Sequence, residues 1–418
     1  MLVLFLAASA APTPLYRVYQ ARWGFSATTL TANFAVYVLF LLATVLIFGS
    51  LSDHVGRRPV IITALAVDTA ASILFLLAHG VGALFAARSL QGVAVGLAAN
   101  ALGAALLDLR PAGSLAPLVT SNAGTVGLAL GALGTSVLVQ YGPVPTHLVW
   151  WLLLGTFLAA ILLAAAMPEP GTVWPGALAA LRPDITVPRS ARGTFARAAP
   201  CLVAVWALGG FYLSLGPSLA AQLSGSSNLL WGGIIAFLLT GLGAVTASVF
   251  RNAAPIAVML GGCLGLLGGA AVTIAAIVTR TPALLLLGTV LAGLGFGPGN
   301  LGAYRVIMAR ASPSNRAGLI AAISIVNYLA LGLPALLAGI ATSHFGLHDT
   351  ALVYSAVIAL LAAAAAGGFL FESRGRTRAP QAAAPAPELP PGPCTVPPYM
   401  QATRQEPEPA ITAEATER

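Results

Sequence analysis

The sequence predicts an all-α polytopic membrane protein whose twelve transmembrane helices form two six-helix halves related by a parallel pseudo-repeat. Three observations support this fold class. Of the 418 residues, 58% are hydrophobic and only 8% are charged; apolar runs of membrane-spanning length recur; and a segment of the first half reappears in the second. Because a soluble domain carries about 25% charged residues, a chain so poor in charge must be solvated by lipid.

The apolar runs can be counted, since a helix needs about 20 apolar residues to cross the hydrocarbon. In the first half, residues 1–166, the candidate spans are 1–16, 29–51, 59–78, 82–107, 117–139 and 147–166. In the second half, residues 199–371, they are 199–221, 229–250, 255–278, 282–304, 317–340 and 351–371. Two sets of six spans predict two structural halves.

The first span, MLVLFLAASAAPTPLY, is shorter than the others. Its Ala-Ser-Ala triplet resembles a signal-peptidase site, but the positively charged segment that begins a signal peptide is missing. Cleavage would also leave eleven spans and put the two termini on opposite sides. We therefore expect a true membrane helix, and a start codon assigned too far downstream would explain its shortness.

Two segments read as non-membrane sequence. Residues 167–198 are rich in Pro, Gly and Arg, which predicts a cytoplasmic linker between the halves. Residues 372–418 are rich in Pro, Ala and Glu and lack any burial pattern, which predicts a disordered cytoplasmic tail.

The arginines indicate the orientation of the spans. All 20 basic residues are Arg; sixteen fall on the side of the N-terminus, only Arg17, Arg22 and Arg280 fall on the other side, and Arg88 lies within a span. Positive charge accumulates on cytoplasmic loops, so both termini are expected in the cytoplasm. The absence of Lys, with abundant Ala, Gly and Pro, indicates a GC-rich bacterial genome and hence the bacterial cytoplasmic membrane.

An internal repeat relates the two halves. Residues 84–110 align with residues 284–310 at an offset of 200, which pairs Asn100 with Asn300 and Arg110 with Arg310. A parallel repeat of six-span halves is an architecture described for membrane transporters.

Two motifs carry a resemblance to a known family. The loop between the second and third spans, GSLSDHVGRR, follows the pattern G-x-x-x-D-x-x-G-R-R through Gly49, Asp53, Gly56, Arg57 and Arg58. It resembles the signature loop of the major facilitator superfamily. In the fourth span, LFAARSLQG at residues 84–92 resembles that superfamily's l-x-x-x-R-x-x-q-G pattern. The resemblance implies a secondary transporter that works by alternating access between two rocking halves.

The signature loop has the chemistry of a gate. Its glycines allow a tight turn and close helix approach, and Asp53 can pair with an Arg or cap the positive end of a helix. The resemblance implies that Asp53 reaches the start of the eleventh span, near Ser314 and Arg316.

Arg88 and Asp68 are the candidate coupling residues. An Arg within a span costs at least ~2.5 kcal/mol on insertion scales, so Arg88 must face a partner, a water-filled cavity or the outer interface. In the family this Arg is associated with proton coupling and substrate binding. Asp68 is the only carboxylate deep in an apolar run, which makes it a candidate protonation site with Arg88 as counter-ion. A structural pair or a packing role for Asp68 is the alternative.

The fifth span carries a row of small residues, Gly124, Gly127, Gly131 and Gly134. The row resembles the superfamily's antiporter motif g-x-x-x-G-P-x-x-G-G, but Ala132 replaces its Pro. Efflux and ordinary close packing of helices are therefore both open.

The resemblance further implies that the first, fourth, seventh and tenth spans line a central cavity. The polar and aromatic candidates on these spans, besides Arg88, are Tyr16, Gln91, Asn100, Trp206, Tyr212, Ser214, Asn300 and Tyr304. The GFGPGN segment at 295–300 is expected to unwind or kink the tenth span. Because few of the candidates are charged, we expect a neutral or amphipathic substrate.

The functions that remain follow from these residues. Proton-coupled efflux is the leading hypothesis; a uniporter or a proton symporter for uptake of sugar- or metabolite-type molecules is the alternative, and a membrane-embedded sensor or enzyme is a remote one. No HExxH, GxSxG or Walker pattern occurs, so we expect no enzyme activity, no cofactor and no metal. The expected partners are the lipid bilayer, a small-molecule substrate and protons, with no nucleic acid, and the expected state is a monomer.

Overall fold

The computed structural model describes residues 1–108, 116–171, 185–312 and 315–378, and these residues contain helices and no strand. Residues 1–372 form one compact unit. The helices are α1 Leu2–Ala10, α2 Pro12–Trp23, α3 Ala27–Phe48, α4 Leu51–Val55, α5 Arg57–Leu76, α6 Val81–Asp108, α7 Ala116–Tyr141, α8 Leu148–Ala166, α9 Arg189–Ser214, α10 Gly216–Ser224, α11 Leu230–Val249, α12 Pro255–Thr279, α13 Pro282–Met308 and α14 Arg316–Arg378.

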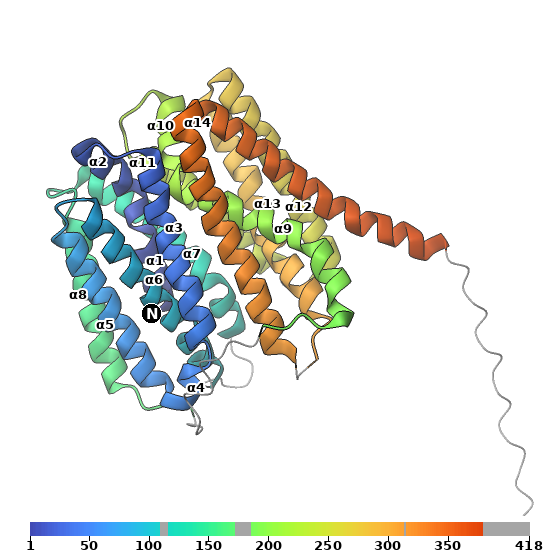
Figure 1. Cartoon of the computed structure of the whole chain (residues 1–418), viewed down its shortest axis with the longest axis horizontal. Coiled ribbons are helices and arrows are strands. Elements are labelled where there is room, and N and C mark those ends of the chain that lie inside the picture. Colours follow the sequence, from blue (N-terminus) through green and yellow to red (C-terminus); the bar gives the residue numbers. More distant parts are fainter. Residues whose placement is uncertain (109–115, 172–184, 313–314, 379–418) are drawn as a thin grey trace, which may run out of the picture. The chain divides into compact units, whose positions relative to one another are not determined.

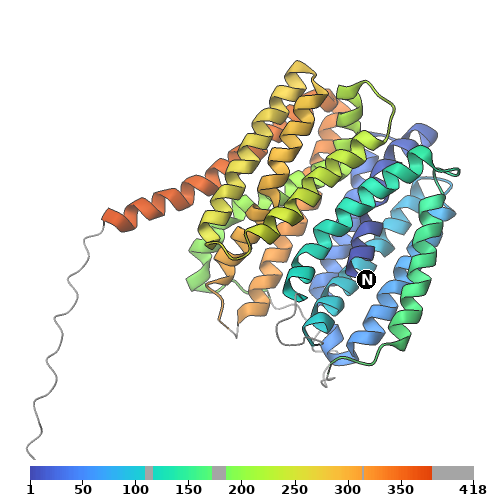
Figure 2. The ribbon, with the colours of Figure 1, turned by 180° about the vertical axis from the view of Figure 1, so that it is seen from behind.

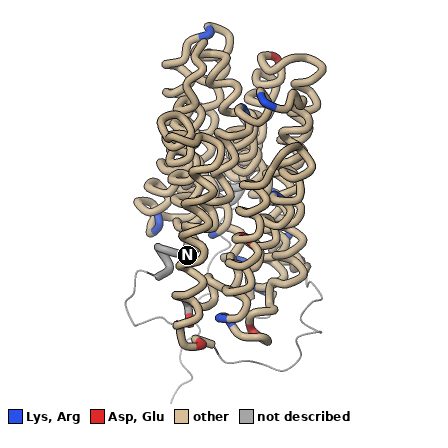
Figure 3. The backbone as a smooth tube through the Cα atoms, turned by 90° about the vertical axis from the view of Figure 1, so that its left-hand side faces the viewer, with Lys and Arg blue, Asp and Glu red and all other residues tan. Residues whose placement is uncertain are grey.

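Eleven helical segments of the described chain are long and apolar enough to cross a membrane. The last of them, α14, is two helices that meet at Gly346, where φ is 82° and ψ is 162°. Only glycine adopts this backbone conformation without strain. Counting the two arms of α14 separately gives twelve spans, in agreement with the sequence, and the charged positions are few along them (Figure 3).

The first span is longer than its sequence suggested. Instead of ending near residue 16, α1 and α2 together run from Leu2 to Trp23, a segment of 22 residues. Pro12 and Pro14 lie in the first turn of α2, where a helix does not need their missing N–H groups. The chain therefore stays helical past Arg17, which was expected in a loop.

The other boundaries also shift. The expected linker is shorter at its end, because α9 begins at Arg189 rather than near residue 199. The expected tail begins later, because α14 continues to Arg378. Within these two segments, residues 172–184 and 379–418 lie outside the described residues.

Each half has a large hydrophobic core, and the first half has a smaller second cluster around Trp150. Within the compact unit, helices α1–α8 form one group and the helices from α9 onward form a second group beside it (Figures 1 and 2). Residues such as Phe5, Ile61 and Phe157 fill the first core, and residues such as Leu202, Met259 and Leu266 fill the second. A few residues of the second half, Leu213 and Leu331 among them, join the first core. The halves therefore have separate cores and a common contact.

Candidate functional site

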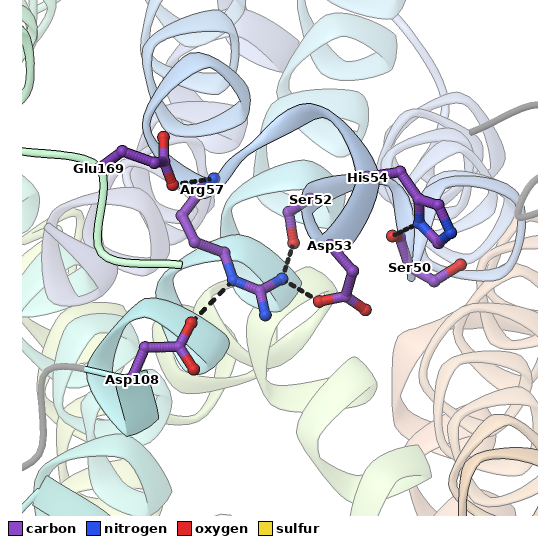
Figure 4. Close-up of polar contacts among 7 residues, drawn as sticks. All are labelled: Ser50, Ser52, Asp53, His54, Arg57, Asp108 and Glu169. Carbon is purple, nitrogen blue, oxygen red and sulfur yellow. Dashed lines mark hydrogen bonds and ion pairs between the residues drawn. The ribbon is translucent and has the colours of Figure 1, made fainter. Parts of the chain in front are cut away.

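The loop between α3 and α5 forms a network centred on the Arg57 guanidinium (Figure 4). It makes an ion pair with Asp53, one helical turn earlier. Its Nε donates to Asp108 Oδ2 at 3.0 Å and its Nη1 donates to Ser52 Oγ at 2.7 Å. Gly56, at φ 105°, makes the turn that leads from α4 into α5. The network joins this loop to the end of α6.

Glu169 belongs to the same network, although the sequence analysis did not single it out. Its two carboxylate oxygens accept from the backbone N–H groups of Arg57 at 2.6 Å and of Arg58 at 3.0 Å. A carboxylate at this position satisfies free N–H groups and matches the positive end of the helix dipole. The signal for it was a lone acid directly after the sixth span, at the same membrane face as the loop.

Within the described residues, Asp53 has a partner other than the one expected. Asp53 pairs with Arg57, and no ion pair joins it to Arg316 among the described residues; Ser314 lies outside them. The turn at Gly56 between α4 and α5 brings the Arg57 guanidinium back to Asp53. In this conformation the loop network therefore joins α4, α5, α6 and the end of α8, all of them in the first half.

Arg88 lies in a buried polar cluster rather than at an interface. Its side chain is fully buried. Its Nε donates to the Tyr16 hydroxyl at 2.6 Å, and its Nη1 donates to Ser9 O and Gln91 Oε1, each at 2.7 Å. The guanidinium also lies 5.0 Å from the centre of the Tyr37 ring. These contacts compensate for the burial of a charge.

Asp68 lies beside this cluster and is also fully buried. Arg88, Gln91 and Tyr37 are near enough to interact with it electrostatically, yet neither of its oxygens has a hydrogen-bond partner among the described residues. The Gln91 amide donates to Ala8 O instead. Arg88 Nη2 likewise has no partner in this part of the chain. The structure thus brings the two coupling candidates together without an ion pair between them.

A cavity of ≈ 260 Å³ lies between the two halves. Its wall carries no charged side chain. The lining residues are Leu2, Leu6, Ser9, Thr13, Phe34, Tyr37, Leu41, Val95, Ala99, Gly124, Thr125, Leu128, Trp206, Gly209, Leu213, Thr240, Phe296, Asn300, Tyr328 and Leu331. They come from α1, α2, α3, α6, α7, α9, α11, α13 and α14, so both halves contribute.

Of the eight further cavity candidates, only Trp206 and Asn300 line this cavity, and Trp206 Nε1 donates to Asn300 Oδ1 at 3.0 Å. The other six are not among the residues that line it. Tyr16 and Gln91 are bonded to Arg88, Asn100 donates to Gly96 O, Tyr212 contacts Thr289, Ser214 donates to Gly210 O, and Tyr304 is 36% exposed.

The sequence analysis also missed part of the wall. Phe34 and Tyr37 come from α3 and Tyr328 comes from α14, two spans that were not expected at the cavity; aromatic residues inside these spans were the available signal. The 295–300 segment does not unwind, because α13 remains helical through Pro298. Gly299 packs there against Gly262 of α12, which holds the segment in the bundle.

The two halves touch at the end of the spans that lies away from α4. There Thr28 Oγ1 of α3 lies 2.9 Å from Ser343 Oγ of α14. On the opposite side of the cavity, Leu229 N, just before α11, donates to Gln140 Oε1 of α7 at 2.9 Å. A Cβ on Gly339 or Gly233 would collide with the facing helix. These contacts close one end of the space between the halves.

The glycine row of the fifth span packs within its own half. A Cβ on Gly127 would lie 2.6 Å from Val3 O, and one on Gly131 would lie 2.2 Å from Ala7 O. By contrast, Gly124 and Gly134 have nothing within 4 Å of that position. The row therefore brings α7 close to α1, and it does so without the proline of the antiporter motif.

Comparison with known proteins identifies the family. The sequence profile of the Major Facilitator Superfamily matches residues 1–271, and the chain belongs to this superfamily. No curated protein sequence matches the chain. The protein is a multi-pass membrane protein with the superfamily's transporter fold.

Three solved structures illustrate the likeness of fold. A bacterial homolog of the human lysosomal transporter Spinster, in an inward-facing and occupied conformation, has a TM-score of 0.68 at 15% identity over 88% of this chain and 94% of its own. The nucleoside transporter NupG has a TM-score of 0.65 at 14% identity over 88% and 96%. The human organic anion transporter MFSD10 (TETRAN) has a TM-score of 0.60 at 19% identity over 87% and 96%.

Proposed function

We propose that this chain is a secondary active transporter that moves a small neutral or amphipathic molecule across the bacterial cytoplasmic membrane by alternating access. The observation that carries this proposal is the cavity, which both halves line and which contacts between the halves close at the end away from α4, whereas no such closing contact is seen at the other end among the described residues. With both termini in the cytoplasm, as the arginine distribution favours, the closed end faces outward. The protein would then be inward-facing and would act as a monomer.

The composition of the cavity wall supports the choice of substrate. Its lining side chains are apolar, aromatic or uncharged polar, and a charged molecule would have to leave water without a partner of opposite charge. The similar structures carry organic anions or nucleosides by their names, so the fold alone does not select a substrate class. The wall of this cavity favours a neutral one.

Proton coupling is the leading form of the proposal. An ionised carboxylate without a partner is expensive in a dry site, and Asp68 can avoid that cost by binding a proton or by capturing Arg88. Arg88 also touches the cavity wall, since it contacts Ser9 and Tyr37, two lining residues. Protonation of Asp68 and occupation of the cavity would then both act on the position of Arg88, which couples them. Efflux against an inward proton flow follows if the proton and the substrate exclude each other.

The test is transport by the full chain in proteoliposomes, with radiolabelled chloramphenicol and uridine as neutral probes. We expect counterflow exchange of at least one probe without any gradient, and accumulation of that probe when the lumen is made acidic. Asp68→Asn should keep counterflow and lose the response to the pH gradient, because the amide cannot gain or lose a proton. Asp349→Asn, at an exposed site on α14, is the control and should behave as the wild type.

The outcomes separate the alternatives. Counterflow that ignores the pH gradient in the wild type would remove proton coupling and favour uniport. Accumulation driven by a lumen more alkaline than the medium would favour proton symport and uptake. Failure of both probes to exchange would contradict the neutral-substrate proposal.

A further inference from the structure

We infer that Asn300 makes the cavity selective for flat, neutral molecules that carry a hydrogen-bond acceptor. The inference rests on the proposed function, because it takes this cavity as the substrate site. It starts from the contact between Asn300 on α13 and Trp206 on α9, where the indole Nε1 lies 3.0 Å from Asn300 Oδ1.

The chemistry of the indole fixes which way the Asn300 amide points. An amide can present its oxygen or its NH2 group toward a neighbour, but a tryptophan Nε1–H can only donate. The Asn300 oxygen must therefore face Trp206, and the NH2 group, with its two donors, must point away. Asn300 has no other hydrogen bond among the described residues, so these donors are free on a side chain that lines the cavity.

The other polar side chains of the wall do not compete for this role. All four lining Ser and Thr hydroxyls donate to backbone carbonyls, those of Leu6, Leu213, Asn122 and Ala236. What remains is the hydroxyl of Tyr37 and that of Tyr328, and a tyrosine hydroxyl can donate or accept. Among the residues that line the cavity, Asn300 is thus the one with an unpaired polar group, its side-chain NH2, that can donate a hydrogen bond but cannot accept one.

The surroundings of Asn300 add a preference for a flat ring. The Trp206 and Tyr328 rings meet edge to face, with centroids 6.0 Å apart at 63°. Phe296, one turn before Asn300, also lines the cavity. Such rings favour an aromatic guest by offset or edge-on contact.

The selectivity follows from the cost of an unpaired donor. A guest with a ring nitrogen or carbonyl can accept from the Asn300 NH2 group. A guest of the same shape without an acceptor displaces water from that group and leaves it unsatisfied, which sites built to hydrogen-bond a substrate penalise strongly. We expect a preference of about tenfold for the acceptor-bearing guest.

The experiment compares quinoline, which has a ring-nitrogen acceptor and no donor, with naphthalene, which has the same shape and neither. Binding of both to the full chain in nanodiscs is measured by equilibrium dialysis, with protein-free nanodiscs subtracted to remove partition into lipid. We expect the wild type to bind quinoline about tenfold more tightly than naphthalene. Asn300→Leu should bring the ratio of the two affinities close to one, mainly because naphthalene binds more tightly: leucine has the same branched shape as asparagine but no donor that the guest would leave unsatisfied.

Trp206→Phe tests the orientation argument separately. It keeps an aromatic ring but removes the donor that fixes the amide, so Asn300 can turn and the quinoline preference should fall by at least threefold. Trp151→Phe, at a 60% exposed position on α8, is the matched control and should keep the wild-type ratio. A normal ratio in Trp206→Phe would overturn the orientation argument.

Two results would overturn more. Equal affinity of the wild type for quinoline and naphthalene would refute the selectivity and leave the transport proposal standing. No binding of either guest, in a protein that exchanges chloramphenicol or uridine in proteoliposomes, would show that the substrate site lies elsewhere, and would refute this inference without refuting transport.

Discussion

The third and fourth spans of each half solve the same packing problem in different ways. In the second half, α12 and α13 approach through facing glycines: a Cβ on Gly295 would lie 2.6 Å from Gly262 O, and one on Gly265 would lie 2.6 Å from Gly295 Cα. In the first half, the equivalent helices α5 and α6 bury Asp68 and Arg88. The backbones of α12 and α13 are in close contact, whereas α5 and α6 bury two ionisable side chains, which is energetically unfavourable.

The internal repeat allows the two halves to be compared residue by residue. Asn100 and Asn300 align at an offset of 200, yet only Asn300 lines the cavity, while Asn100 Nδ2 donates to Gly96 O of its own helix at 3.4 Å. Arg88 aligns with Gly288, and a Cβ on Gly288 would lie 2.6 Å from Thr273 Oγ1 of α12. One half thus carries the groups that we propose for proton coupling, and the other half carries the amide that we propose recognises the substrate.

The glycine contact of α12 and α13 should give the largest effect. Gly295→Ala forces a methyl group against the backbone of α12, and backbone cannot move aside as a flexible side chain can. We expect a loss of stability of about 3 kcal/mol, measured as the loss of folded protein in a thermal unfolding assay of detergent-solubilised protein.

Gly261→Ala is the matched control, because nothing lies within 4 Å of the position its methyl group would take. It should unfold like the wild type or slightly later, since alanine favours a helix more than glycine does. Equal unfolding of Gly295→Ala and the wild type would show that the helix pair can open without cost, and the contrast between the halves would lose its physical basis.

The first-half loop should give an intermediate effect. Glu169→Gln keeps the side-chain shape but removes the negative charge that faces the N-terminus of α5 and one of the two acceptor oxygens. We expect a loss of about 1–2 kcal/mol and a reduced rate of counterflow exchange. The same assays on Asp349→Asn, an exposed carboxylate of α14 in the second half, should show neither change. A wild-type melting temperature for Glu169→Gln would remove Glu169 from the network.

The fold was largely predictable because hydropathy and charge are properties of segments. Spans of apolar residues and a loop such as GSLSDHVGRR are visible without knowing any contact. The boundaries that failed are those where a local signal misled: Arg17 looked like a loop residue but lies in α2, and the arginines after Arg189 begin a helix rather than a linker.

The site was less predictable because it depends on partners far apart in the sequence. Asp53 was expected to reach the eleventh span, but Arg57 was closer. Glu169 lies more than a hundred residues from the amides it caps. Tyr16 and Gln91 lie on cavity-lining helices yet turn toward Arg88 instead. A sequence states which helix a residue is on, and contacts decide which way it faces.

Mutation of the second-half contact between Arg305 and the loop before α12 should give the smallest loss of stability. It tests whether a charged loop network stabilises only the first half. Where the first half has three carboxylates around Arg57, the second half has Arg305, whose Nη1 donates to Ala253 O at 2.8 Å. Arg305→Gln removes a single hydrogen bond to a neutral carbonyl near a helix end, so we expect a loss of about 0.5–1 kcal/mol and counterflow exchange within twofold of the wild type. Thermal unfolding and counterflow exchange, measured on Arg305→Gln and Glu169→Gln in parallel, show which variant loses more stability and activity. If Arg305→Gln cost more than Glu169→Gln, the second loop would be the more important of the two for stability, and the loop network of the first half would not be what distinguishes the halves.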